Sequence, residues 1–289
     1  MSSRQTQQAP PEKKTPRAGR NLPAAIGTGA ALLVPAVLGI IFFEALLIAL
    51  WVVILCLGVW EVARALQTRG LVVPKIPLYI GAAAMPLAAY FGGVEALTLA
   101  LLLTGLLILI AAALGTPDPG RSIMASIFVA CWVPFLISFA VLMLHLDEGN
   151  WRLAVVVLLV VANDTFGYVA GVFFGKHPMA PRVSPKKSWE GFAGSMTGAV
   201  VVGVLTSWLI FDEPLYIGAL LAAAVVVAAT AGDFSESMVK RELELKDMSQ
   251  ALPGHGGVMD RLDSLVFAMP TAYFLLVALT GESPGIPLG

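Results

Sequence analysis

The chain has 289 residues, of which 58% are hydrophobic and only 13% are charged. Soluble domains contain about 25% charged residues, so this composition and a mean hydropathy of +0.84 exclude a single soluble globular domain. Two cysteines are too few for a disulfide-stabilised scaffold, and the apolar composition excludes a disordered chain. We therefore predict an all-α, polytopic integral membrane protein.

Nine stretches are long and apolar enough to cross the hydrocarbon core, which takes about 20 residues of helix. They are Asn21–Phe43, Ala45–Ala63, Ile76–Val94, Ala96–Pro117, Ser122–Leu146, Leu153–Gly175, Gly191–Phe211, Pro214–Gly232 and Ser264–Gly281. Residues 1–20 are expected to form a disordered cytoplasmic tail. Two regions follow, residues 21–150 with the first five helices and residues 151–289 with the last four.

The positions of lysine and arginine predict the orientation. If the N-terminus is cytoplasmic, 17 of the 18 basic residues fall on the cytoplasmic side, and Arg152 is the exception. This is the bias that the positive-inside rule describes. We therefore expect a cytoplasmic N-terminus and a C-terminus on the outside.

Only two of the nine stretches contain a charged residue, Glu61 in the second and Asp164 in the sixth. A carboxylate in the middle of a span costs about 2.5–3.5 kcal/mol on insertion scales. Asp164 is therefore expected to line a substrate cavity, although a polar contact between helices is the alternative. Small residues recur at every fourth position in the sixth and seventh stretches, which predicts close packing of these two helices. They are Gly167, Gly171 and Gly175, followed by Gly191, Ser195, Ala199 and Gly203.

Two cytoplasmic loops are more polar than linkers need to be. Residues 176–190 have a net charge of +3 and include Ser184, Lys186 and Lys187. Residues 233–263 have a net charge of −3, which the positive-inside rule does not explain. Phe234–Asp247 lacks Gly and Pro and is expected to form a separate cytoplasmic helix, which the Gly-rich turn after it ends.

Three carboxylates are expected to converge where the second loop meets the membrane. Asp233 follows the eighth stretch, and Asp260 and Asp263 lie three residues apart at the start of the ninth. Oxygen ligands of this kind suit hard cations such as magnesium, although a helix N-cap is the alternative for either of the last two. Magnesium reverses the local charge and attracts a nucleoside triphosphate, while the basic loop is expected to contact phosphate.

The sequence from Ser237 to Asp263 resembles the 27-residue signature of the phosphatidate cytidylyltransferases, also called CDP-diacylglycerol synthases. Its parts are Lys240-Arg241, Lys246-Asp247, Leu252-Pro253-Gly254-His255-Gly256-Gly257 and Asp260-Arg261-Leu262-Asp263. The segments from Asp164 to Lys176 and from Ser184 to Gly191 are similar to a second polar region of that family, with Ser188 where many members have Thr. The resemblance covers roughly residues 155–275.

The resemblance implies a membrane enzyme that converts CTP and phosphatidic acid to CDP-diacylglycerol and pyrophosphate. It also implies magnesium as cofactor, leaving a second cation open, and a homodimer in the cell membrane with no nucleic-acid partner. The implied catalytic residues are Asp233, Asp260, Asp263 and Lys246, of which the three aspartates hold the metal. The implied substrate-binding residues are Asp164, Ser184, Lys186, Lys187, Lys240, Arg241, His255 and Arg261. The four C-terminal helices and their two loops are thus the expected catalytic region.

Two other functions are alternatives. CDP-alcohol phosphatidyltransferases have further aspartates after a D-x-x-D-G sequence, whereas here Asp263 is followed by Ser264-Leu265 and by no later Asp. A secondary transporter with Asp164 as its ion site is the other alternative. Such transporters often carry internal repeats, but the first 150 residues contain nothing similar to Asp164 or to the acidic loop.

Overall fold

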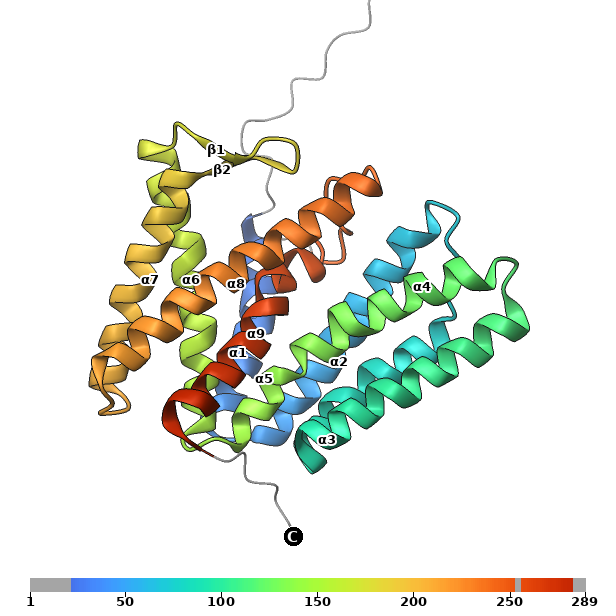
Figure 1. The fold of residues 1–289 in the computed structure, drawn as a ribbon, viewed down its shortest axis with the longest axis horizontal. Coiled ribbons are helices and arrows are strands. Elements are labelled where there is room, and N and C mark those ends of the chain that lie inside the picture. The colour runs from blue at the N-terminus through green and yellow to red at the C-terminus, as the bar shows by residue number, and fades with distance from the viewer. Residues whose placement is uncertain (1–21, 253–255, 283–289) are drawn as a thin grey trace, which may run out of the picture.

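The computed structural model describes residues 22–252 and 256–282 and is helical apart from one short hairpin (Figure 1). The helices of the first half are α1 (Leu22–Ile41), α2 (Glu44–Gln67), α3 (Lys75–Gly115), α4 (Pro119–Ala130), the π-helical turn η1 (Cys131–Phe135), α5 (Phe139–Leu142) and the 3₁₀ turn η2 (Met143–His145). The second half contains α6 (Gly149–Phe174), strands β1 (Pro178–Ala180) and β2 (Ser184–Ser188), α7 (Trp189–Leu209), α8 (Leu215–Glu242) and α9 (Met259–Thr280).

Each of the nine apolar stretches overlaps helix in the part of the chain that the structure describes. The third and fourth both lie in α3, which is interrupted at Gly92 and Gly93. Gly93 has φ 67° and ψ −156°, a conformation open to glycine because it has no Cβ. The two halves of α3 then pack on each other, with Gly81 against the side chain of Thr104. Among the described residues, seven helices are long and apolar enough to cross a membrane, so the chain is a multi-pass membrane protein. The number of crossings and the orientation stay predictions.

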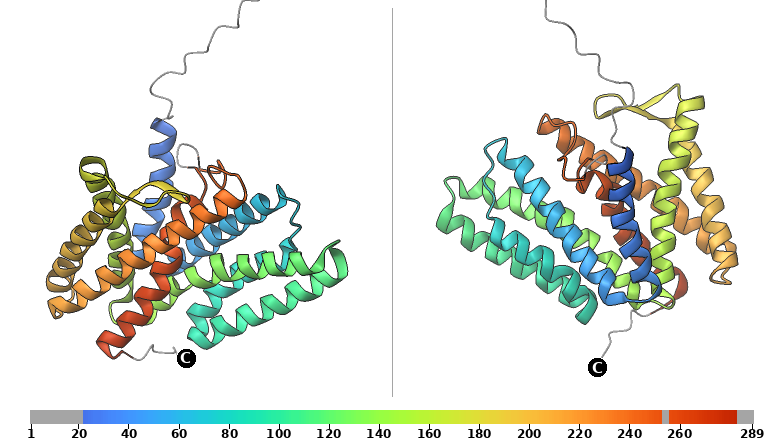
Figure 2. Two further views of the ribbon diagram at one scale, coloured as in Figure 1. Left: turned by 45° about the horizontal axis from the view of Figure 1, so that its top comes forward. Right: turned by 180° about the vertical axis from the view of Figure 1, so that it is seen from behind.

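The helices form two groups with α1 and α9 between them (Figures 1 and 2). Helices α6 and α7 form a hairpin that α8 crosses obliquely, and α2, α3 and α4 form the other group. Leu55, Leu78, Val133 and Met269 belong to a continuous apolar core that joins the groups. Side chains on the second half of α3, such as Leu102, face outward, as expected for contact with lipid.

The predicted close packing of α6 and α7 is confirmed. A Cβ added at Gly191 would lie 3.1 Å from the carbonyl oxygen of Gly167, so the two backbones nearly touch. The hydroxyl of Ser195 donates a hydrogen bond of 2.6 Å to the carbonyl oxygen of Asn163 across the same contact. Small side chains permit this approach, which brings the segments at the ends of these helices together.

Helix α8 corrects one prediction. Phe234–Asp247 is not a separate helix, because α8 continues without a break from Leu215 to Glu242. No Gly or Pro follows Asp233 to interrupt the helix. The helix ends in a turn in which Glu244 has φ 51° and the Leu245 amide donates to the carbonyl oxygen of Lys240. Since residues three and four apart share a helix face, Asp233, Glu236 and Lys240 form one polar stripe.

Residues 176–190, expected to be a loop, contain the antiparallel hairpin β1–β2. The carboxylate of Glu190 closes its base by accepting hydrogen bonds from the amides of Lys176 (3.0 Å) and His177 (3.2 Å). The hairpin lies at the same end of the molecule as the C-terminal end of α8 and the start of α9 (Figure 1). The two polar loops meet there, through Lys187 with Asp233 and Arg241 with Val183.

Arg152, the exception to the positive-inside pattern, lies at the opposite end. Its guanidinium donates to Glu213 at 2.8 Å and to Glu282 at 2.9 Å, and only 6% of its side chain is exposed. It also lies 5.0 Å from the ring centroid of Phe211. Arg152 is thus a buried, paired cation, and it remains the one exception to the positive-inside pattern.

Candidate active site

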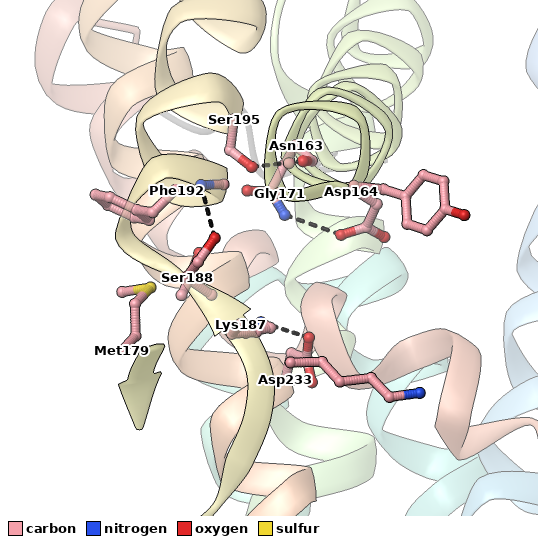
Figure 3. A pocket seen from close by; sticks show the side chains of 14 residues that line it. Asn163, Asp164, Gly171, Met179, Lys187, Ser188, Phe192, Ser195 and Asp233 are labelled. Atoms are coloured by element: carbon pink, nitrogen blue, oxygen red, sulfur yellow. Dashed lines mark hydrogen bonds and ion pairs between the residues drawn. The ribbon is translucent and has the colours of Figure 1, made fainter. Parts of the chain in front are cut away.

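A pocket of about 240 Å³ opens between α6, the β hairpin, α7 and α8. Four of the predicted site residues line it: Asp164, Lys186, Lys187 and Asp233. Figure 3 shows Lys187 and Asp233 directed toward each other, with Asp164 and Asn163 on the α6 side. The pocket thus joins side chains from both polar loops and from the middle of the sequence.

Lys187 and Asp233 form an ion pair across the pocket. The ammonium group of Lys187 also lies 4.8 Å from the ring centroid of Phe234, close enough for a cation–π interaction. Strand β2 is therefore fixed to α8 at the position where the eighth predicted stretch ended. Lys187 was expected to contact phosphate. In the structure its ammonium group is bound to the carboxylate of Asp233.

The α6 wall of the pocket is polar. Asp164 accepts a hydrogen bond of 2.9 Å from the side-chain amide of Asn163. The other amide atom, Oδ1 of Asn163, is buried and has no hydrogen-bond partner within the described structure. Asp164 also interacts electrostatically with Asp233, Lys187 and Arg261. This placement supports the cavity-lining interpretation of Asp164.

A second polar group continues along α8 from the pocket. The ammonium of Lys240 forms ion pairs with Glu236 and with Asp260, the latter at 2.9 Å. Asp260 also accepts hydrogen bonds from the amides of Met248 (3.1 Å) and Gly257 (2.8 Å). Asp260 thus binds Lys240 and holds the ends of the loop that precedes α9.

Asp263 connects the two groups. A Cβ added at Gly232 would lie 2.2 Å from the carbonyl oxygen of Asp263, so α8 and α9 are in backbone contact beside Asp233. Asp263 interacts electrostatically with Asp233 and Asp164, and Glu236 interacts with Asp263 and Asp260. Asp233, Glu236 and Asp263 are thus electrostatically coupled where α8 meets α9, and their convergence on one metal ion stays a prediction.

Three predicted residues lie away from both the pocket and the polar group around Lys240. Ser184 pairs with Ala180 in the hairpin, and the exposed Arg241 donates at 3.3 Å to the carbonyl oxygen of Val183. Lys246 is exposed on the turn after α8. Arg261 lies at the start of α9 within electrostatic range of Asp164, and His255 lies outside the described residues.

Two acidic residues were missed in the sequence. Glu236 is fully buried beside Lys240, and its Oε1 has no hydrogen-bond partner in the part of the chain that the structure describes. Glu61 of α2 is also fully buried and contacts the start of α9. Glu236 could have been found from its spacing to Asp233 and Lys240 on one helix. For Glu61 the only signal was its charge within an apolar span.

The oxygen atoms of the acidic side chains are of the kind that binds a hard cation. Asp233, Glu236, Asp260 and Asp263 offer carboxylate oxygens, the ligands that magnesium prefers, and the unpartnered Oε1 of Glu236 is an acceptor that a cation would satisfy. Within residues 22–252 and 256–282, however, no three His, Cys, Asp or Glu side chains are placed to hold one ion. Asp233 and Asp260 form ion pairs with Lys187 and Lys240 instead, and the magnesium site stays a prediction.

Comparison with known proteins shows which family of proteins the chain belongs to. The sequence profile of the Cytidylyltransferase family matches residues 24–279, and the chain belongs to this family of nucleotidyltransferases. The chain is 39% identical to a phosphatidate cytidylyltransferase of Mycobacterium leprae, over 92% of this chain and 91% of the relative. It is 37% identical to one of Mycobacterium bovis, over 93% and 92%. One from Thermotoga maritima is 33% identical over 56% of this chain and 62% of the relative.

Proposed function

We propose that this chain catalyses the reaction of CTP with phosphatidic acid, which gives CDP-diacylglycerol and pyrophosphate for phospholipid synthesis. The similarity to phosphatidate cytidylyltransferases over more than nine-tenths of the chain supports the reaction. The observation that carries the site is the pocket in which Lys186 and Lys187 from the hairpin face Asp164 and Asp233 from α6 and α8. Phosphoryl-type transfer needs such charge neutralisation and positioning more than it needs a protein nucleophile.

In this reaction an oxygen of the phosphatidate phosphate attacks the α-phosphorus of CTP. The bond from the α-phosphorus to the oxygen that bridges to the β-phosphate breaks, and pyrophosphate leaves. The pocket lies at the polar end of α6 and α7, beside side chains exposed on α6 such as Tyr168. A lipid phosphate at the membrane boundary and a nucleotide from the cytoplasm can both reach such a place.

The basic side chains are proposed to hold the phosphates. Lys186 lines the pocket and is exposed, so its ammonium is available to a phosphate oxygen. Lys187 and Lys240 are held by carboxylates, which keep both ammonium groups directed toward the acidic residues. Charge-assisted hydrogen bonds from such groups to phosphate are worth about 1.5–3 kcal/mol each. Arg261 is proposed to assist from the start of α9.

The acidic side chains are proposed to hold magnesium. Asp233, Asp260 and Asp263 are the ligands in this proposal, with Glu236 next to them. When bound, magnesium neutralises charge on the triphosphate and on the leaving pyrophosphate. If a second cation binds, turnover at saturating magnesium should still rise when that cation is added.

Two further features of the proposal are the location and the assembly. Several apolar helices and the bacterial relatives support the cell membrane as the location. The homodimer rests on the family resemblance alone. Cross-linking in native membranes followed by mass measurement of the purified species tests the dimer.

Purified protein in detergent, given phosphatidic acid, magnesium and cytosine-labelled CTP, tests the reaction. We expect label to become extractable into organic solvent in proportion to the pyrophosphate released. Diacylglycerol, which has no phosphate, is the matched acceptor and should take up no label. Labelling that is equal with both acceptors, or absent with phosphatidic acid, would contradict the proposal.

A further inference from the structure

We propose that Glu61, on helix α2 of the N-terminal half, is a positioning residue that fixes Asp260 and the segment before α9 in place. Its carboxylate accepts hydrogen bonds from the amides of Val258 (2.8 Å) and Met259 (2.7 Å), and the hydroxyl of Ser249 donates to it as well. Glu61 has no exposed surface. A carboxylate buried among apolar helices is expensive unless it is fully satisfied, and these three donors satisfy it.

The place of this carboxylate is specific. The first amides of a helix lack partners within the helix, and the positive end of its dipole favours an anion there. Helix α9 begins at Met259 and has no side-chain cap of its own on residue Val258. Glu61 supplies the cap from a helix nearly 200 residues earlier in the sequence. The start of α9 is therefore held by the N-terminal half of the protein.

Glu61 and Asp260 hold the same segment from two sides. Asp260 accepts from the amides of Met248 and Gly257, and Glu61 binds the neighbouring residues Ser249 and Val258. Within this segment, Leu252 and Gly256 are also joined by reciprocal backbone hydrogen bonds. Each end of the segment thus contacts one carboxylate from α2 and one from α9.

Gly257 shows how closely the two carboxylates approach. A Cβ added there would lie 2.8 Å from Oε2 of Glu61 and 2.9 Å from Oδ2 of Asp260. A side chain at this position would have to displace one of the two carboxylates, so glycine permits both to approach the segment. Because Asp260 also forms the ion pair with Lys240, a shift of this segment would move both of these side chains.

Glu61→Gln keeps the size of the side chain but turns one acceptor oxygen into an amide donor that faces backbone N–H groups. We expect kcat to fall by about ten- to a hundredfold, the effect of misplacing reacting groups by a fraction of an ångström to 1 Å. In hydrogen exchange, the amides of residues 256–260 should exchange about tenfold faster through local opening. Peptides from α6 and α7 should exchange at the wild-type rate.

Glu44→Gln is the matched control, because Glu44 belongs to the same helix and bonds Tyr90 and Asn150 at the opposite end of the molecule. It should change neither kcat nor exchange at 256–260. Ser249→Ala removes one donor to Glu61 and should raise exchange at the same peptide by a smaller factor. This second variant decides the matter if Glu61→Gln does not fold.

Unchanged exchange at 256–260 in both variants overturns the proposal. So does an equal rise in every peptide, which would mean a purely structural role, or a kcat within about twofold of wild type despite faster local exchange. The turnover measurement rests on the proposed cytidylyl transfer, whereas the exchange measurement needs no substrate. Absence of turnover in the wild-type protein would therefore reject the proposed function and leave the exchange result to decide the role of Glu61.

Discussion

Lys187 of strand β2 forms an ion pair with Asp233 of helix α8. This contact joins the basic hairpin to the acidic end of α8, two segments that the sequence predicted to have separate tasks. A carboxylate that holds an ammonium group is less available to a metal ion, so Lys187 and magnesium compete for Asp233 in the proposed mechanism. The pairing therefore makes the two lysines of the hairpin unequal.

Lys187→Ala is expected to lower the magnesium concentration for half-maximal activity by about two- to fivefold, because a partly exposed ion pair is worth about 0.2–1 kcal/mol. Maximal turnover should fall at the same time, since a phosphate contact is lost. Lys186→Ala removes a pocket lysine that forms no ion pair within the described residues, so it should raise the KM for a substrate and leave the magnesium midpoint unchanged. Magnesium titration at saturating CTP compares the two variants. Equal midpoints in both would contradict the competition.

Asp233→Asn and Asp260→Asn are each expected to reduce kcat/KM at least about a hundredfold, a loss of about 2.7 kcal/mol in transition-state stabilisation. The amide keeps the shape but loses the charge that binds Lys187 or Lys240 and, in the proposal, the metal. Asp212→Asn is the control, because Asp212 is exposed at the opposite end and has φ 50°, which asparagine tolerates. Retention of more than about a tenth of the activity in either site variant would show that the assignment is wrong.

Arg152→Met is expected to lower the free energy of unfolding by about 3 kcal/mol, because it leaves the Glu213 and Glu282 carboxylates without their buried partner. Activity per folded molecule should not change, since the group lies at the end opposite to the pocket. Arg121→Met removes an exposed arginine that pairs with Asp118 and should have an effect below about 1 kcal/mol. Thermal unfolding in detergent compares them, and equal shifts would argue against the buried cluster.

Gly203→Ala is expected to destabilise the contact of α7 and α8, because the added Cβ would lie 2.3 Å from the carbonyl oxygen of Gly218. Forced overpacking of this kind costs about 1–3 kcal/mol. Gly115→Ala, where the added Cβ has no neighbour within 4 Å, should be neutral or slightly stabilising. If both variants melt at the same temperature, α7 and α8 are not packed as closely as described.

The sequence predicted those features that depend on local pattern. Apolar length located the helices, small residues at every fourth position predicted the α6–α7 contact, and the signature around Asp260 predicted the family. The hairpin was missed because its strands are short and polar, and β2 includes Ser184, Pro185 and Lys186. The continuity of α8 could not be predicted from hydropathy, because the apolar stretch ends at Gly232 whereas the helix continues to Glu242.

The contacts of Glu61 could not be predicted for a different physical reason. They join residues 61 and 259, and no periodicity or spacing encodes which distant helix supplies a cap. The sequence shows only that a charge lies in an apolar span, which favours a function without naming a partner. The same limit applies to the pairing of Lys187 with Asp233. The sequence identified both as candidate site residues, but it did not predict that they contact each other.

The most direct test of the account follows the two ends of the triphosphate. Purified protein is given phosphatidic acid, magnesium and CTP labelled either on the α-phosphorus or on the γ-phosphorus. Cytidylyl transfer predicts α-label in the lipid extract and γ-label in pyrophosphate, with both lost in Asp233→Asn. Appearance of γ-label in the lipid, or lipid labelling that survives in Asp233→Asn, would contradict the reaction and the site proposed for it.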